Sequence, residues 1–151
     1  MRRKLALLAP LALLWAPVAM AENNRCTVSV SSVQFGTYSA LRLGDVRTTG
    51  TVVYNCTQAS PITIAISRGG GSFLENRRMT QAGFDLAYNL YLDAAGSIMW
   101  GDGTSGTQVY RDPAPAPNTN MSVPIYARVP ANQRLAHTGP YDDNLIVTIN
   151  Y

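Results

Sequence analysis

Hydrophobic and polar positions alternate along this chain in short segments, and the clearest segment is the last one. Apolar side chains recur at Leu145, Val147, Ile149 and Tyr151, with a different residue between each pair. A period of two is typical of a strand with one buried face. The alternation continues to the final residue, so no sequence follows that could cover the open edge of a sheet. The pattern predicts a sandwich that is one strand short.

Similar alternation recurs at regular spacing through the rest of the chain. Turn-forming runs separate the segments, chiefly Gly69–Gly71, Gly101–Gly103 and the proline-rich Pro113–Pro117. Residues 41–50 are expected to be a polar connection, and residues 73–83 show only a hint of a strand around Arg78. Seven or eight short strands without a convincing helix predict an all-β sandwich. The strands are expected at residues 26–35, 51–56, 62–66, 86–92, 98–100, 109–110, 121–127 and 145–151.

The N-terminal residues 1–21 have the features of a secretory signal peptide. A positive start is followed by an apolar run, Leu5–Val18, and by the small-residue site Ala19–Ala21. The run is too short to span a bilayer, and no stop-transfer segment follows it. We expect cleavage before Glu22, export through the periplasm, no membrane insertion of the mature protein, and one domain over residues 22–151.

Removal of the signal peptide changes the charge of the protein. The chain has 12 Lys and Arg against nine Asp and Glu, and three of those cations are Arg2, Arg3 and Lys4. The nine remaining cations balance the nine acids, so the mature domain is formally neutral. The basic character of the whole chain is therefore no argument for nucleic-acid binding.

Cys26 and Cys56 are the two cysteines of the chain. One pair of cysteines in an exported protein predicts a disulfide. The alternative is a reactive thiol or part of a zinc site, but His137 is the single histidine and would leave the zinc ligand set incomplete.

The sequence does not contain a catalytic set, and we expect no enzyme, cofactor or metal site. Asp142 and Asp143 are adjacent, so on a strand they would face opposite sides, and we interpret them as a solvated turn. Asp93 and Asp102 could suggest a calcium loop, but they lack the ligand spacing of known calcium motifs, and a hairpin turn is the better interpretation.

Aromatic residues leave open a carbohydrate-binding function. Tyr88 and Trp100 are expected in the core, the usual location of aromatic residues in a sandwich. Tyr91, Tyr110 and Tyr126 are better candidates for exposed sugar-stacking platforms.

Several segments, in order, resemble the spore coat protein U domain family, which comprises secreted coat proteins and subunits of archaic chaperone–usher pili. The similarity extends over the whole predicted mature chain and begins at Cys26. Its segments are Val33–Tyr38 (VQFGTY), Gly50–Cys56 (GTVVYNC), Leu86–Tyr91 (LAYNLY), Trp100–Thr104 (WGDGT), Pro124–Ala131 (PIYARVPA) and Gly139–Asp142 (GPYD).

The resemblance implies an incomplete immunoglobulin-like β-sandwich that lacks its last strand and is completed by donor-strand complementation. The implied partners are a periplasmic pilus chaperone, an outer-membrane usher and a neighbouring pilus subunit, and the implied location is the cell surface or a pilus. Leu145, Val147, Ile149 and Tyr151 would then form the edge of the groove that receives the donor strand.

The sequence departs from polymerising members of the family before its first cysteine. Those members carry a long alternating extension, whereas only the polar residues Glu22–Arg25 precede Cys26 here. This predicts a subunit that accepts a donor strand without giving one, as at the tip of a fibre, with a role in adhesion or biofilm formation. The alternatives are a non-fibrous spore-coat or matrix protein and a carbohydrate-binding module.

Overall fold

A computed structural model describes residues 23–41 and 43–151 of the protein. The predicted signal peptide and its cleavage site lie outside the described residues. Within the described ranges, every regular element is a strand, and no helix occurs that would be long and apolar enough to cross a membrane. The strands are β1 (Cys26–Val30), β2 (Val46–Cys56), β3 (Ile62–Ile66), β4 (Arg77–Gln81), β5 (Phe84–Tyr91), β6 (Tyr110–Asp112), β7 (Met121–Val129) and β8 (Val147–Asn150).

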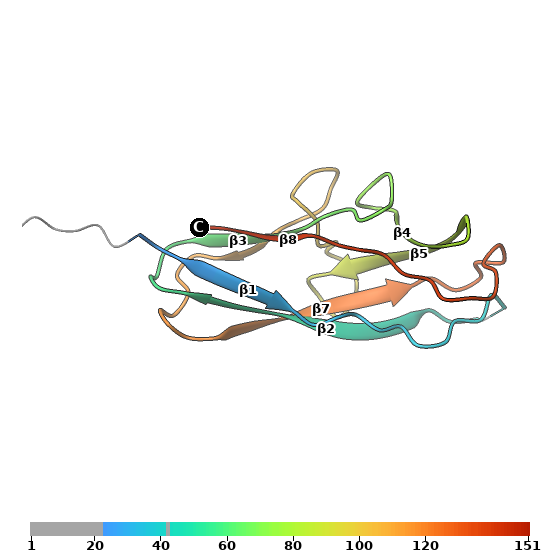
Figure 1. Cartoon of the computed structure of the whole chain (residues 1–151), viewed down its shortest axis with the longest axis horizontal. Helices are drawn as coiled ribbons and strands as arrows, with labels where there is room; N and C mark the ends of the chain where they lie inside the picture. Colours follow the sequence, from blue (N-terminus) through green and yellow to red (C-terminus); the bar gives the residue numbers. More distant parts are fainter. Residues whose placement is uncertain (1–22, 42) are drawn as a thin grey trace, which may run out of the picture.

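The strands form two antiparallel sheets that pack as a sandwich (Figure 1), which confirms the predicted all-β class. The larger sheet has the order β1-β2-β7-β5-β4, and the smaller sheet has the order β6-β3-β8. Residues 113–120, which contain the proline-rich run, connect β6 in the smaller sheet to β7 in the larger one. The chain therefore crosses between the sheets where proline prevents strand pairing.

The core lies between the sheets and comes from the inward-facing positions of both. Val52, Tyr54 and Cys56 alternate on β2, and the three isoleucines of β3 oppose them; all are at most 2 % exposed. Trp100 is fully buried, and its indole nitrogen donates a hydrogen bond to the Ile64 carbonyl at 2.9 Å. Tyr88 is buried as well, so the prediction for both aromatic residues is confirmed.

Several of the predicted strand boundaries are wrong, and the first strand, expected over residues 26–35, ends at Val30. Strand β2 begins at Val46 rather than Thr51, because it pairs with β7 along its length, from Val46 opposite Val129 to Tyr54 opposite Met121. Polar residues 47–49 hid this extension because most of them face away from the core. Residues 98–100 form single bridges instead of a strand.

Arg77 is a core residue that the sequence pattern did not reveal. Its side chain is fully buried, and its guanidinium donates to the carbonyls of Ser67 (2.9 Å), Ile66 (3.1 Å) and Trp100 (2.7 Å) and to Asn89 Oδ1 (2.6 Å). Burial lowers its pKa, because desolvation disfavours the charged form. One cation thus joins β4, β5 and the end of β3.

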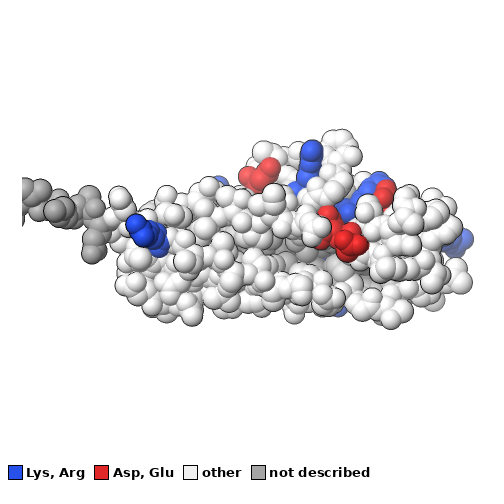
Figure 2. All heavy atoms as spheres, in the orientation of Figure 1, with Lys and Arg blue, Asp and Glu red and all other residues white. Residues whose placement is uncertain are grey.

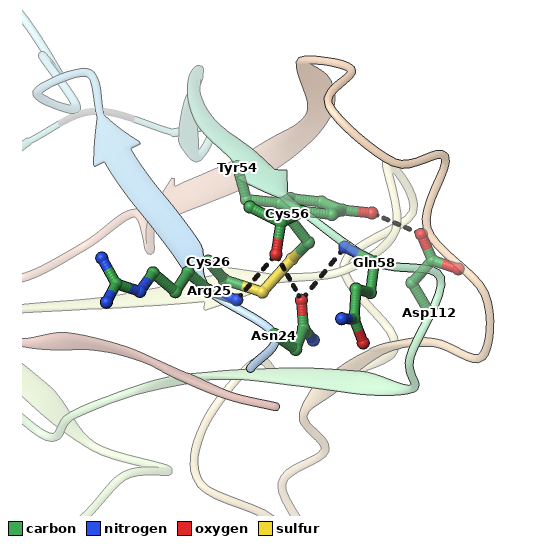
Figure 3. The surroundings of a disulfide bond; sticks show 8 residues. Asn24, Arg25, Cys26, Tyr54, Cys56, Gln58 and Asp112 are labelled. Carbon is green, nitrogen blue, oxygen red and sulfur yellow. Dashed lines mark hydrogen bonds between the residues drawn. A yellow bond between two sulfur atoms is a disulfide. The ribbon is translucent and has the colours of Figure 1, made fainter. Parts of the chain in front are cut away.

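The predicted disulfide between Cys26 and Cys56 is present and links β1 to β2 (Figure 3). The two residues are direct cross-strand partners, with Cα atoms 4.1 Å apart. Beside the bridge, Tyr54 donates to Asp112 at 2.6 Å, which ties β2 to β6 of the other sheet. Burial, together with this hydrogen bond, raises the pKa of Tyr54.

Removing the disulfide should lower stability substantially. The double variant Cys26→Ala/Cys56→Ala loses a cross-link between residues 30 positions apart. Loop-closure entropy then predicts a loss of roughly 3–4 kcal/mol in the free energy of unfolding. Urea unfolding of wild type and variant under identical conditions measures the difference. Alkylation of the denatured, unreduced wild type followed by intact-mass analysis should find no free thiol; two labelled cysteines would contradict the pairing.

Candidate functional site: an open sheet edge

The candidate site is the unpaired side of β8. Strand β8 pairs with β3, from Ile66 opposite Val147 to Thr63 opposite Asn150, and within the described residues no strand pairs with its other side. Strand β1 is the edge of the opposite sheet and lies beside β8 (Figure 1). The sandwich is therefore open between its first and last strands.

The register fixes which backbone groups of β8 face the opening. Just before the strand, the amide nitrogen of Ser67 donates to the Ile146 carbonyl at 2.9 Å, so Ile146 directs its backbone toward β3. Backbone direction alternates along a strand, so Thr148 also faces β3. The N–H and C=O groups of Val147 and Ile149 then point to the open side, where another strand could pair with them.

The side chains along the opening are apolar and incompletely covered. Leu145, Val147 and Ile149 pack against the core but stay half-buried, unlike the fully buried isoleucines of β3 opposite them. Apolar side chains of the N-terminal segment are in the same state. We call the following six residues the open edge: Val28, Val33, Phe35, Leu145, Val147 and Ile149.

A close backbone approach allows Val33 to reach this position. Val28 and Val33 both face the core although they are five residues apart, an odd separation that would place them on opposite faces of a regular strand. The alternation is therefore interrupted between them, and Val30 is 43 % exposed. Ser31 still hydrogen-bonds to Thr51, which keeps the chain beside β2. A Cβ atom on Gly50 would lie 2.8 Å from a methyl group of Val33, so glycine at this position provides the space.

Hydrogen bonds to Asp143 hold the chain where it enters β8. The Asp143 carboxylate accepts hydrogen bonds from the Tyr88 hydroxyl (2.7 Å) and from the amide of Gly70 (2.8 Å). Burial and this carboxylate raise the pKa of Tyr88, and Phe35 packs edge-on against the Tyr88 ring at 5.8 Å. The expectation of a solvated turn is therefore wrong for Asp143. Asp142 is exposed, but its backbone forms a bridge with Thr80 instead of a turn.

Tyr151 lies apart from the other residues predicted for this edge. It follows β8 and is 57 % exposed, whereas the three residues before it in the alternation pack on the core. It lines an open hollow of about 460 Å³ together with Pro61, Pro113 and Arg111. Its assignment to the groove stays a prediction.

The surface along β1 and β8 is largely uncharged, although Asp143 lies at the entry to β8. Figure 2 shows an uncharged surface over β1 and most of β8, with the acidic and basic residues on other parts of this face. Asp102 accepts hydrogen bonds from the amide and hydroxyl of Thr104, which lower its pKa, and this geometry is that of a turn. The described part of the chain holds no cluster of three or more metal-ligating side chains. The open edge, with its apolar side chains and largely uncharged surface, is therefore suited to binding an apolar strand.

Of the three tyrosines expected to be exposed, two are half-buried and the third is buried. Tyr110 and Tyr126 are half-buried, but Tyr91 is 5 % exposed. The Arg128 guanidinium lies 4.9 Å from the centre of the Tyr91 ring and donates to its hydroxyl at 2.7 Å. The prediction for Tyr91 is wrong because a neighbouring arginine covers its ring.

These features define an immunoglobulin-like β-sandwich whose last strand is missing from the described residues. The chain matches the Spore Coat Protein U domain family over residues 14–148 and belongs to that family. A search of the curated proteins finds no match.

A solved structure shares the fold. It is a chain of the pre-assembly complex between the chaperone CsuC and the tip adhesion subunit CsuE, from archaic chaperone–usher Csu pili of Acinetobacter baumannii. The identity is 18 % and the TM-score 0.59, over 85 % of this chain and 40 % of that one. This chain thus corresponds to less than half the length of that protein.

Proposed function

We propose that this protein is an exported subunit of a chaperone–usher type surface fibre and that its open edge receives a donor strand. The observation that carries the proposal is the set of half-buried apolar side chains beneath the unpaired backbone of β8. A strand placed there would add main-chain hydrogen bonds to Val147 and Ile149 and would cover the exposed core. This is the β-augmentation mode of recognition.

The chemistry of the edge identifies the kind of partner. The donor must present alternating apolar residues, because only one face of an inserted strand meets the core. A periplasmic chaperone would supply such a strand first, and a neighbouring subunit would replace it after passage through an outer-membrane usher. The shared fold with a chain from a chaperone–subunit complex supports this assignment.

The open edge can be tested with a pair of adjacent substitutions. Val147→Asp would bury a carboxylate among apolar side chains, which should weaken capture of a donor peptide by at least about 3 kcal/mol, or more than a hundredfold in Kd. Thr148→Asp is the matched control, because Thr148 is exposed and faces away from the core. Peptide binding by fluorescence anisotropy gives both affinities. Equal weakening in the two variants, or none in Val147→Asp, would refute this site.

We also infer a tip-type position in the fibre, with a role in adhesion or biofilm formation. Asn24 and Arg25 are hydrogen-bonded to Thr57 and Gln58 at the end of β2 (Figure 3), so they extend the β1–β2 pairing of their own domain. Cleavage before Glu22 would leave just two residues beyond them, too few to fill another subunit's edge.

The tip assignment depends on the mature N-terminus and on whether the chain can donate. N-terminal sequencing of the exported protein should give Glu22. Mixed with a strand-accepting subunit, the protein should not form a donor-strand complex stable in native electrophoresis. A complex that forms and disappears when residues 22–25 are deleted would overturn the assignment.

A further inference from the structure

A polar cleft lies on the outer face of the larger sheet, away from the open edge. Its volume is about 260 Å³, and the turn at Ala94–Gly96 forms one wall. Arg128 and Tyr126 alternate with the buried Ala127 and Val129 of β7, so their side chains point away from the core. Arg47 and Thr49 of β2 are their cross-strand partners and complete the floor.

Two arginines converge on this cleft. A Cβ atom on Gly96 would lie 3.6 Å from Nη1 of Arg128 and 3.8 Å from Nη1 of Arg47, so both guanidinium groups are close to one point. Side chains larger than glycine at this position would reduce the space in front of them. The position also has a φ of +74°, which disfavours them independently.

The positive charge of this pair is only partly balanced. Asp45 lies 4.0 Å from Arg47 and 3.8 Å from Arg128, beyond the distance of a charge-assisted hydrogen bond. Asp93 directs both carboxylate oxygens to Ser97 and Ile98 in its own turn. Arg47 makes one long hydrogen bond, 3.4 Å to the Ala94 carbonyl, so most of its donors are available to a ligand.

We propose that this cleft binds an acidic saccharide, with the sugar carboxylate on Arg47 and Arg128. Arginine pairs readily with carboxylates because its planar donors match their two oxygens. The exposed Thr49 hydroxyl and the half-buried Tyr126 ring add a polar contact and an aromatic face, which a sugar ring can use together. The volume is below the roughly 300–1,000 Å³ of pockets for drug-sized ligands, so the bound part should be no larger than a sugar ring or two, and an oligosaccharide would extend into solvent.

Titration with three small probes tests the proposal. Glucuronate, glucose and acetate are added to the purified protein, with or without a donor strand, and binding is followed by NMR shifts of backbone amides around Gly96. Glucuronate should saturate and bind at least about tenfold more tightly than glucose, because only glucuronate offers a charged acceptor. It should also bind at least about tenfold more tightly than acetate, which has the charge but no ring.

Substitutions inside and outside the cleft then test whether glucuronate binds there. Arg47→Gln should weaken glucuronate binding at least about tenfold, whereas Arg111→Gln on the other sheet should leave it unchanged. Equal affinity for glucose and glucuronate would show that the arginines do not bind the carboxylate. Equal affinity for acetate, or no saturation by glucuronate, would overturn the saccharide site. Because the cleft is separate from the open edge, failure here leaves the proposed donor-strand function untouched.

Discussion

Expressed in the periplasm without a partner, this protein should aggregate or be degraded, and an alternating apolar donor peptide should convert it to a stable monomer. The open edge exposes apolar side chains and an unpaired strand, which together favour self-association. Donor peptide should raise the soluble yield and give one cooperative unfolding transition. The same peptide with its apolar residues changed to serine is the control.

The size of this effect follows from the number of apolar side chains that become buried when the donor strand binds. Four or five apolar side chains that become buried stabilise by roughly 1.5–3 kcal/mol each, on the order of 6–15 kcal/mol in total. An ordinary domain has a total stability of about 5–15 kcal/mol. The donor strand therefore decides whether the fold persists. A partner-free monomer that melts cooperatively at high temperature, with no gain from the peptide, would disprove the strand-short interpretation.

Arg77→Met should be the most damaging single substitution outside the open edge. Methionine has a similar length but no donor, so the three carbonyls that Arg77 contacts would lose their buried partner, whereas Asn89 Oδ1 would keep the Leu90 amide. Each unsatisfied buried acceptor costs roughly 1–3 kcal/mol, so the loss should be on the order of 4 kcal/mol or more.

Urea unfolding of the donor-bound protein measures this effect. Arg78→Met is the matched control, because Arg78 is a partly exposed neighbour that pairs with Asp85 at 2.8 Å. A surface ion pair of this kind contributes about 1 kcal/mol or less. Similar losses of stability in the two variants would show that the buried hydrogen bonds of Arg77 contribute no more than a surface ion pair.

Strict alternation predicted the strands that have one buried face. Three isoleucines in β3 and the residues around Val147 in β8 gave the period of two directly, because one side of each strand meets the core. The disulfide followed from the count of cysteines and the expected compartment. The open edge could be predicted because Leu145, Val147 and Ile149 keep the alternation of a strand with one buried face.

The remaining features depend on contacts between distant segments. Nothing local distinguishes Arg77 from the partly exposed Arg78, since the burial of Arg77 depends on carbonyls that Ser67 and Trp100 supply. The burial of Tyr91 likewise depends on Arg128, 37 residues away. The cleft near Gly96 was missed because its two arginines come from different strands and converge only through the pairing of β2 with β7.

Amide hydrogen exchange along β8 tests the donor-strand proposal most directly. In the protein folded with a donor peptide, the amides of Val147 and Ile149 should be protected as strongly as that of Thr148, because the peptide pairs with the open side. Without peptide, any folded fraction should protect only Thr148, which faces β3. Fast exchange at Val147 and Ile149 in the presence of saturating peptide, beside a protected Thr148, would contradict the proposal.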